Sequence, residues 1–173
     1  MSKKKKLYIG KYLLLAGVII AAAAGGIFWY LFQEKRDEAK IIRNLQTLAT
    51  DLSKSTEENP AMTLLKLKSC SDAFDFPATV SFSKSYSNEY DREKFTSSLG
   101  RYRALLKELD INISDIQVVL KDSENAEAVF SGQYNIKSKL GTSHSDVNDV
   151  TAVMVKIEGV WKIKRLHFSK VLH

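Results

Sequence analysis

The chain has very few cysteines and prolines. Its 173 residues include one cysteine, Cys70, and two prolines. A single cysteine cannot form an internal disulfide, so packing and hydrogen bonds must hold the fold together. We expect Cys70 to be a small buried hydrophobic residue. With few prolines and no low-complexity linker, residues 33–173 have the size of one soluble domain.

Signatures of common enzyme classes are also missing. The sequence has no glycine-rich phosphate loop, no Ser-His-Asp signature and no nucleophile elbow. Its three histidines, His144, His167 and His173, lack the spacing of metal ligands, and the single cysteine adds no ligand cluster. The sequence therefore predicts no catalytic residue, no metal and no cofactor, and it favours a protein that is not an enzyme.

The predicted soluble part has little excess of charge of either sign. The whole chain has 26 Lys and Arg against 20 Asp and Glu, a net charge of +6. Five of these lysines precede residue 12, so 21 basic and 20 acidic residues follow. A nucleic-acid-binding domain is expected to be basic, and we therefore predict no nucleic-acid partner.

Residues 12–32 contain no charged side chain. A helix of this length would match a hydrocarbon core of about 30 Å. Five lysines precede the segment and three basic residues follow it closely, which predicts a cytoplasmic N-terminus. We predict a basic cytoplasmic tail at 1–11 and a single-pass transmembrane signal-anchor at 12–32. The soluble domain would then be periplasmic or extracellular, on the outer side of the cytoplasmic membrane.

A cleaved signal peptide is the alternative, because small residues follow an apolar run. Cleavage after Ala24 would leave the apolar segment 27–32 at an exposed terminus, so we favour a retained anchor. Gly17, Ala21 and Gly25 are spaced four apart. They would form a small-residue stripe on one helix face, where another membrane helix could pack.

Hydrophobic spacing in the soluble part predicts three helices. A membrane-proximal helix at 33–58 has an apolar stripe, which must pack on its own domain or on a neighbour. Asn59 and Pro60 are suited to start a second helix. Asp91 can cap a third, whose apolar face continues to Leu109.

The rest of the soluble part alternates like a sheet. A half-buried strand pattern covers residues 80–86, and most of the chain after Asn112 alternates, with a polar loop at 141–148. Short polar connections favour antiparallel neighbours. The fold class is therefore α+β, with three helices packed on a curved antiparallel sheet.

Two segments near the C-terminus carry a family resemblance. Residues 126–134 look like the long central strand of the NTF2-like (SnoaL, ketosteroid-isomerase-like) cone fold. Residues 155–163, with a Gly-x-Trp-Lys-Ile sequence, resemble its closing hairpin. The resemblance extends over about residues 40–172, and we place the NTF2-like domain at 59–173. An anchor followed by such a domain is similar in layout to VirB8-type and Mce-associated membrane proteins, which implies a role in an envelope complex.

The resemblance also implies a pocket inside the cone. By alternation we expect five side chains to face it: Phe82, Tyr102, Tyr134, Trp161 and His167. No carboxylate falls on a strand position that clearly faces inward. Asp72 and Asp75 are expected near the mouth, where they could act as acid or base only if burial shifted their pKa. The alternative is that the aromatic residues are core and that the two aspartates are solvated.

We therefore favour a membrane-anchored binding or scaffold protein. Its domain would contact other envelope proteins or a second copy of itself. The alternative is a protein that binds a small apolar molecule such as a lipid in the cone, or an enzyme that converts one.

Overall fold

The computed structural model describes residues 33–82 and 86–170 of the chain. The predicted tail at 1–11 and the predicted membrane helix at 12–32, with Gly17, Ala21 and Gly25, lie outside these residues. Within the described part, no helix is both long enough and apolar enough to cross a membrane. The described residues from Glu38 onward form one compact unit.

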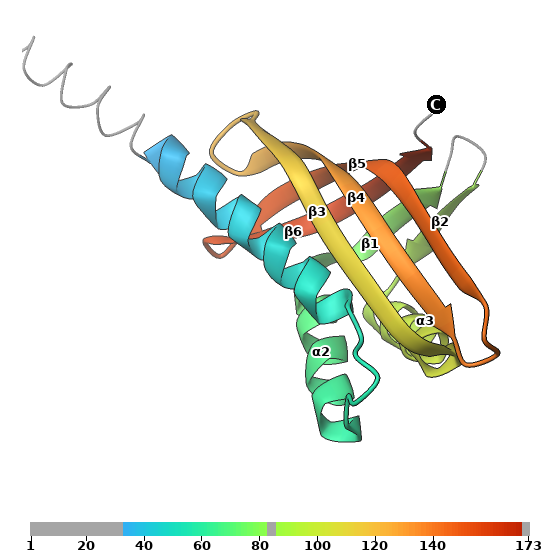
Figure 1. The fold of residues 1–173 in the computed structure, drawn as a ribbon. Helices are drawn as coiled ribbons and strands as arrows, with labels where there is room; N and C mark the ends of the chain where they lie inside the picture. The colour runs from blue at the N-terminus through green and yellow to red at the C-terminus, as the bar shows by residue number, and fades with distance from the viewer. Residues whose placement is uncertain (1–32, 83–85, 171–173) are drawn as a thin grey trace, which may run out of the picture. The chain divides into compact units, whose positions relative to one another are not determined.

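Two α-helices and six strands follow a first helix at residues 33–52. In chain order these are α2 (Pro60–Asp72), β1 (Phe74–Phe82), β2 (Tyr86–Tyr90), α3 (Arg92–Leu105), β3 (Leu106–Leu120), β4 (Asn125–Ser138), β5 (Ser143–Ile157) and β6 (Val160–Lys170). The strands form one sheet in the order β2-β1-β6-β5-β4-β3. β1 and β6 are parallel, and the other neighbours are antiparallel. The sheet is strongly curved (Figure 1), as predicted for the α+β class, but the parallel pair of β1 and β6 departs from the predicted antiparallel sheet.

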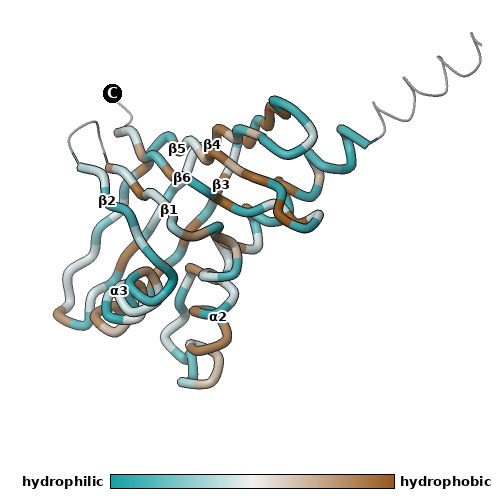
Figure 2. Tube along the Cα trace, turned by 180° about the vertical axis from the view of Figure 1, so that it is seen from behind, coloured by the Kyte–Doolittle hydropathy of each residue, from teal (hydrophilic) through white to brown (hydrophobic). Residues whose placement is uncertain are grey.

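The first helix packs on the sheet of its own domain. Ile41, Leu45 and Leu48 are buried in the same core as sheet residues such as Ala152 and Ile163. The apolar stripe read from the sequence therefore has its partner within the chain. Hydrophobic residues recur along the strands of the sheet, and some also lie on α2 (Figure 2).

The helix starts follow the predicted caps. The Asn59 side chain accepts a hydrogen bond from the Met62 amide at 2.8 Å, and the Asp91 side chain accepts one from the Lys94 amide at 2.7 Å. Each cap satisfies one of the amides that the first turn of a helix leaves without a partner.

Two predicted helix ends were wrong. The first helix ends at Leu52 instead of residue 58, and α3 ends at Leu105, so that Leu109 lies in β3. Side chains from elsewhere in the chain bind the last carbonyls in both places. Arg103 donates to the Leu52 carbonyl, and Lys54 donates to the carbonyls of Arg103 and Leu106. These partners are distant in sequence, so spacing alone could not locate the ends.

The predicted polar loop at 141–148 was also wrong. β5 begins at Ser143 and pairs with β4 along its whole first half. Residues 143–149 are polar on both faces with the exception of Val147, so they lack the hydrophobic alternation that indicates a strand. The hydrogen bonds of the β4 backbone form the strand there instead.

A buried ion pair joins the ends of all three helices. Glu58, just before α2, pairs with Arg103 near the end of α3, and both side chains are at most 2% exposed. Arg103 also donates to backbone carbonyls at the end of the first helix. Lys66 of α2 donates to Glu58 and to the Ser53 carbonyl, at 3.0 and 2.8 Å. The helix ends are thus held by charged hydrogen bonds in a dry site.

The hydrogen bonds also decide the charge state of Glu58. Burial by itself would raise the pKa of Glu58, but hydrogen bonds from Arg103, Lys66 and Thr63 outweigh it and lower that pKa below its ordinary value. The folded state therefore favours the carboxylate, which is the form that binds the two cations.

Cys70 lies in the core, as expected, with 1% of its surface exposed. Burial raises the pKa of its thiol to about 12. Because the thiolate is the reactive form, Cys70 is protected from alkylation in the folded protein.

Replacing Glu58 should destabilise the fold and change its acid response. We expect Glu58→Gln to lower the free energy of unfolding at pH 7 by about 3 kcal/mol, because the buried Arg103 loses its counter-charge. The lowered pKa means that the stabilisation is present above the ordinary value of 4.5 and is lost as pH falls through the folded value. Denaturant titrations at several pH values measure both effects.

Glu108→Gln is the matched control. Glu108 pairs with Lys137 at 2.7 Å, but both side chains are more than a third exposed. Its loss should cost less than about 1 kcal/mol. Equal losses for the two variants, or an unchanged acid response in Glu58→Gln, would contradict the assigned role of the buried pair.

Candidate functional site

The concave face of the sheet and two helices enclose a cavity of about 770 Å³. Its apolar lining comes from the first helix, α3 and five strands. The residues include Leu45, Leu48, Leu52, Phe95, Leu99, Ile111, Ile113, Phe130, Val150, Leu166 and Phe168. A space of this size fits a drug-sized organic molecule.

Gly132 in the middle of β4 keeps part of this space open. It lines the cavity, and its neighbours on the inward face of β4 are Phe130 and Tyr134. A Cβ atom placed at Gly132 would lie 3.4 Å from the Val150 side chain, which is ordinary contact. A methyl group would therefore be accepted there, whereas a longer side chain would enter the cavity.

Polar residues line one side of the cavity, where β4 and β5 pair. Tyr134 is opposite Asp146, Gly132 is opposite Asn148, and Ile136 is opposite His144. Directly paired residues project to the same face of a sheet, so His144, Asp146 and Asn148 follow Tyr134 toward the concave side. We call Tyr134, His144, Asp146 and Asn148 the polar row.

Tyr134 is the centre of the polar row. Its hydroxyl lies 3.4 Å from Nε2 of His144, and the two ring centroids are 5.8 Å apart. Burial raises the pKa of Tyr134, the Asp146 carboxylate raises it further, and a hydrogen bond with Asn148 opposes the change. The Tyr134 hydroxyl is therefore protonated at neutral pH and can donate a hydrogen bond to a ligand oxygen.

Three of the five predicted pocket residues line the cavity: Phe82, Tyr102 and Tyr134. Trp161 is only 2% exposed and belongs to the packed core. The Lys156 ammonium lies 5.4 Å from the centre of its ring. Trp161 therefore occupies the position of a core aromatic residue, which was the alternative to a pocket residue.

The prediction that His167 faces the cavity was wrong. Leu166 and Phe168 line the cavity, so His167 between them points to the other face, where its Nδ1 lies 2.8 Å from the Ser81 hydroxyl. The cause is a shift in the pairing of β5 with β6 between Ile163 and Arg165. Such a bulge adds one residue and reverses the alternation beyond it.

Asp72 and Asp75 do not line the cavity. Asp72 pairs with Arg92 at 2.6 Å, and Asp75 pairs with Lys164 at 2.9 Å. Both are ion-paired outside the cavity lining and neither is buried, so the burial on which an acid or base role depended is not found.

Sequence reasoning missed His144, Asp146 and Asn148 because they fall in the segment read as a loop. A signal was present in their spacing. The three residues are two apart and keep the phase of Val150 and Ala152, which follow on the same strand. Extending that phase backward would have placed a carboxylate, Asp146, on the inward face.

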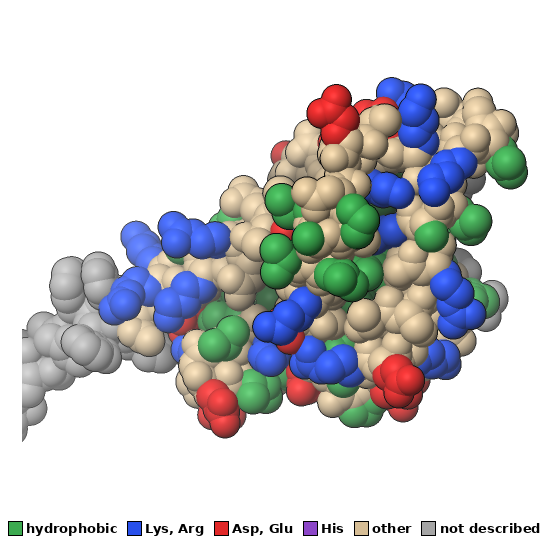
Figure 3. Space-filling model, turned by 90° about the horizontal axis from the view of Figure 1, so that it is seen from below, with side chains coloured by type: hydrophobic (Ala, Val, Ile, Leu, Met, Phe, Trp, Pro, Cys, Tyr) green, Lys and Arg blue, Asp and Glu red, His purple; other side chains and the backbone are tan. Residues whose placement is uncertain are grey.

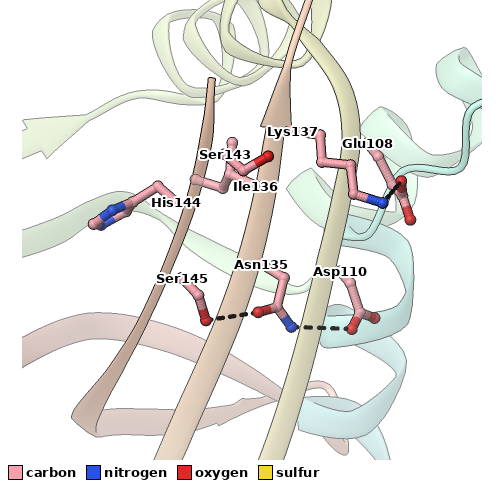
Figure 4. Close-up of a pocket in the computed structure, with 8 residues that line it drawn as sticks. All are labelled: Glu108, Asp110, Asn135, Ile136, Lys137, Ser143, His144 and Ser145. Atoms are coloured by element: carbon pink, nitrogen blue, oxygen red, sulfur yellow. Dashed lines mark hydrogen bonds and ion pairs between the residues drawn. The ribbon is translucent and has the colours of Figure 1, made fainter. Parts of the chain in front are cut away.

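The outward face of the same strands carries a different polar group, beside a shallow depression (Figure 4). Ser145 donates to Asn135 at 2.6 Å, and Asn135 lies 3.5 Å from Asp110. Lys137 and Glu108 form an ion pair next to them.

No group of three or more His, Cys, Asp or Glu side chains in the described ranges 33–82 and 86–170 could hold a metal ion. The cavity wall itself carries Tyr134, His144 and Asn148 of the polar row, and the Asp146 carboxylate lies beside Tyr134. A tyrosine hydroxyl, an imidazole, a carboxylate and an amide can orient a polar ligand group and can transfer a proton.

Known structures share this fold. A candidate scytalone dehydratase from Novosphingobium aromaticivorans is 13% identical, with a TM-score of 0.68, covering 81% of this chain and 87% of that one. The Kfla4162 protein from Kribbella flavida is 13% identical, with a TM-score of 0.67 and coverage of 80% and 93%. The hexachlorocyclohexane dehydrochlorinase LinA-type3 from Novosphingobium barchaimii is 8% identical, with a TM-score of 0.65 and coverage of 82% and 90%.

No curated protein matches the sequence. The model of the SnoaL-like domain family matches residues 64–173. This match includes α2, α3 and all six strands of the sheet, apart from the first residues of α2. The curved sheet and its helices confirm the NTF2-like cone expected from residues 126–134 and 155–163. The chain belongs to the SnoaL-like domain family.

Proposed function

We propose that this protein binds a small, mainly apolar molecule in the cone cavity. The observation that carries the proposal is the distribution of polar groups around the cavity. Its walls are apolar except for Tyr134, His144 and Asn148 of the polar row and a few other hydroxyl and amide side chains. Asp146 is not in the wall itself but lies beside Tyr134. Such a site recognises a ligand with a hydrophobic body and one hydroxyl or carbonyl group.

Within this site, Tyr134 would donate a hydrogen bond to the ligand oxygen. Phe82 and Tyr102 are about half exposed and line the cavity, so they would contact the ligand nearer to solvent. Apolar contact with residues such as Leu99 and Ile113 would supply most of the affinity.

A proton-transfer enzyme is the second candidate, and the inward position of Asp146 favours it. A carboxylate near a tyrosine hydroxyl and an imidazole can remove a proton next to a carbonyl group while the hydroxyl stabilises the oxygen. The dehydratase and dehydrochlorinase names of the similar structures support this class, although the likeness in itself is one of fold. Both candidates use the cavity, which a scaffold role through the outer surface does not require.

We propose further that the N-terminus holds the domain at a membrane. The support is the uncharged segment 12–32 and the lysines before it. The domain would then be outside the cytoplasm, attached by a single span. A layout like that of VirB8-type proteins, with envelope proteins or a second copy as partners, stays a prediction of the sequence.

Filling the cavity should weaken ligand binding. We expect Gly132→Leu in the full chain to lower the affinity for 1-naphthol by about tenfold or more, a loss of about 1.4 kcal/mol. The reason is that the leucine side chain occupies ligand space. Calorimetric titration of the protein in nanodiscs, with empty nanodiscs as the blank, measures the change.

Gly132→Ala is the control for this test. The added methyl group makes only ordinary contacts, so the affinity should change by less than about twofold. If wild type does not bind the probe, or if both variants bind it like wild type, apolar ligand binding in the cavity is refuted.

Asp146→Asn tests the enzyme candidate. We expect the wild type to speed hydrogen–deuterium exchange next to the carbonyl of 1-tetralone, and the variant to lose about 100-fold or more of that rate. Nuclear magnetic resonance of the ketone in deuterated buffer follows the exchange. Asp149→Asn is the matched control. Asp149 is exposed, and by alternation with Asn148 and Val150 it lies on the opposite face of the same strand. Equal rates in the two variants would rule out Asp146 as the base.

The membrane proposal is tested by the mass and extraction of the native protein. We expect the full-length mass, and we expect the protein to stay in the membrane pellet after alkaline carbonate washing. A mature protein that lacks residues 1–24 would instead establish a cleaved signal peptide.

A further inference from the structure

Two leucines are exposed beside the cavity. Leu140 is 92% exposed in the turn between β4 and β5, and Leu105, the last residue of α3, is 67% exposed. The Lys139 amide donates to the Leu105 carbonyl at 3.1 Å, which holds the turn against the helix end. Figure 1 shows this turn beside α3. We call Leu105 and Leu140 the leucine patch.

The patch adjoins the cavity on both elements. Tyr102, one helical turn before Leu105, is 47% exposed and lines the cavity. On the other side, Ile136 and His144 line the cavity and pair just before the turn that contains Leu140. A ligand that leaves the cavity past these residues would meet the leucine patch.

Basic residues surround the leucine patch. Arg101, Lys107, Lys137 and Lys139 are all exposed. The acidic residues on the same segments are Glu108, which pairs with Lys137, and Asp110. With Lys137 paired to Glu108, Arg101, Lys107 and Lys139 against Asp110 give these segments a net positive charge. From below, exposed hydrophobic side chains lie among lysine and arginine side chains, with groups of acidic side chains mainly toward the edge of the view (Figure 3).

The turn itself presents Leu140 at its tip. The Ser138 amide donates to the Thr142 carbonyl at 2.8 Å, and the Gly141 amide donates to the Ser138 carbonyl at 3.1 Å. Gly141 has a φ of 88°, a conformation that few other residues adopt easily. These bonds close the turn, so Leu140 projects from a folded element.

We propose that the leucine patch docks on an anionic lipid bilayer, with the mouth of the cavity beside the membrane surface. Leucines at a protruding tip can enter the headgroup region, and the basic residues match the negative charge of anionic lipids. A stable protein interface buries about 800 Å² on each partner, far more than two leucines provide. The docking goes beyond ligand binding, because it gives an apolar ligand a direct route between bilayer and cavity.

A fluorescent label at the tip tests the docking in the full chain. Leu140→Cys is labelled with a nitrobenzoxadiazole dye, which leaves the buried Cys70 unmodified. The protein is placed in vesicles of phosphatidylcholine and phosphatidylglycerol that carry a lipid-attached quencher. We expect quenching at position 140 that depends on the anionic lipid. Quenching of the same label at Ser123→Cys, in the turn at the opposite end of β3 and β4, should not depend on the anionic lipid.

Charge reversal gives a second readout. Adding Lys139→Glu to the labelled protein should lower the docked fraction, measured by quenching, by about fivefold or more, since each basic residue near an anionic surface contributes about that factor. Vesicles of phosphatidylcholine alone should show the same loss. The exposed position of Lys139 makes a folding defect easy to exclude by thermal melting.

Three outcomes would overturn the proposal. The first is quenching that depends equally on anionic lipid at positions 140 and 123. The second is quenching that neither charge reversal nor neutral lipid reduces. The third concerns the labelled protein without vesicles. If aqueous iodide reaches position 140 at low protein concentration but not at high concentration, the patch is an interface between two copies of this chain. None of these results depends on whether 1-naphthol binds the cavity.

Discussion

The buried pair of Glu58 and Arg103 sets the frame on which the cavity depends. Arg103 joins the end of the first helix to the end of α3, and Lys66 adds α2 to the same cluster. Since the first helix and α3 supply one wall of the cavity, these charged bonds fix the wall against the curved sheet. A buried pair of this kind is a positioning device more than a net source of stability, because desolvation offsets most of its attraction.

The sheet supplies the opposite wall, and its pairing decides which residues face the ligand space. A bulge in β6 turns Leu166 and Phe168 inward and His167 outward. Regular pairing of β4 with β5 places the polar row on the concave side. The cavity is therefore apolar over most of its wall and polar along one ladder, which suits a ligand that must be held in a single orientation.

Leu140 of the leucine patch lies in the turn that joins the two strands carrying the polar row. The turn that carries Leu140 comes directly after the pair of Ile136 and His144. Access to the cavity and contact with a lipid surface would therefore use one end of the domain. A membrane-held protein with such an arrangement is suited to take up or release molecules that dissolve poorly in water.

Much of the fold could be predicted from local patterns. The caps at Asn59 and Asp91, the stripe of the first helix and the closing hairpin at Gly159 depend on residues close together in sequence, where spacing and propensity act directly. The cone family followed from the same segments. The sequence by itself thus determined the α+β class, the burial of Cys70 and the inward position of Tyr134.

Tertiary structure decided the rest. The helix ends depend on Arg103 and Lys54, which bind carbonyls far away in the chain. The first half of β5, which carries His144, Asp146 and Asn148, has no hydrophobic alternation and forms because β4 offers its backbone. The direction of His167 depends on one bulge. In each case a long-range contact outweighs the local pattern, and only the folded chain brings those contacts together.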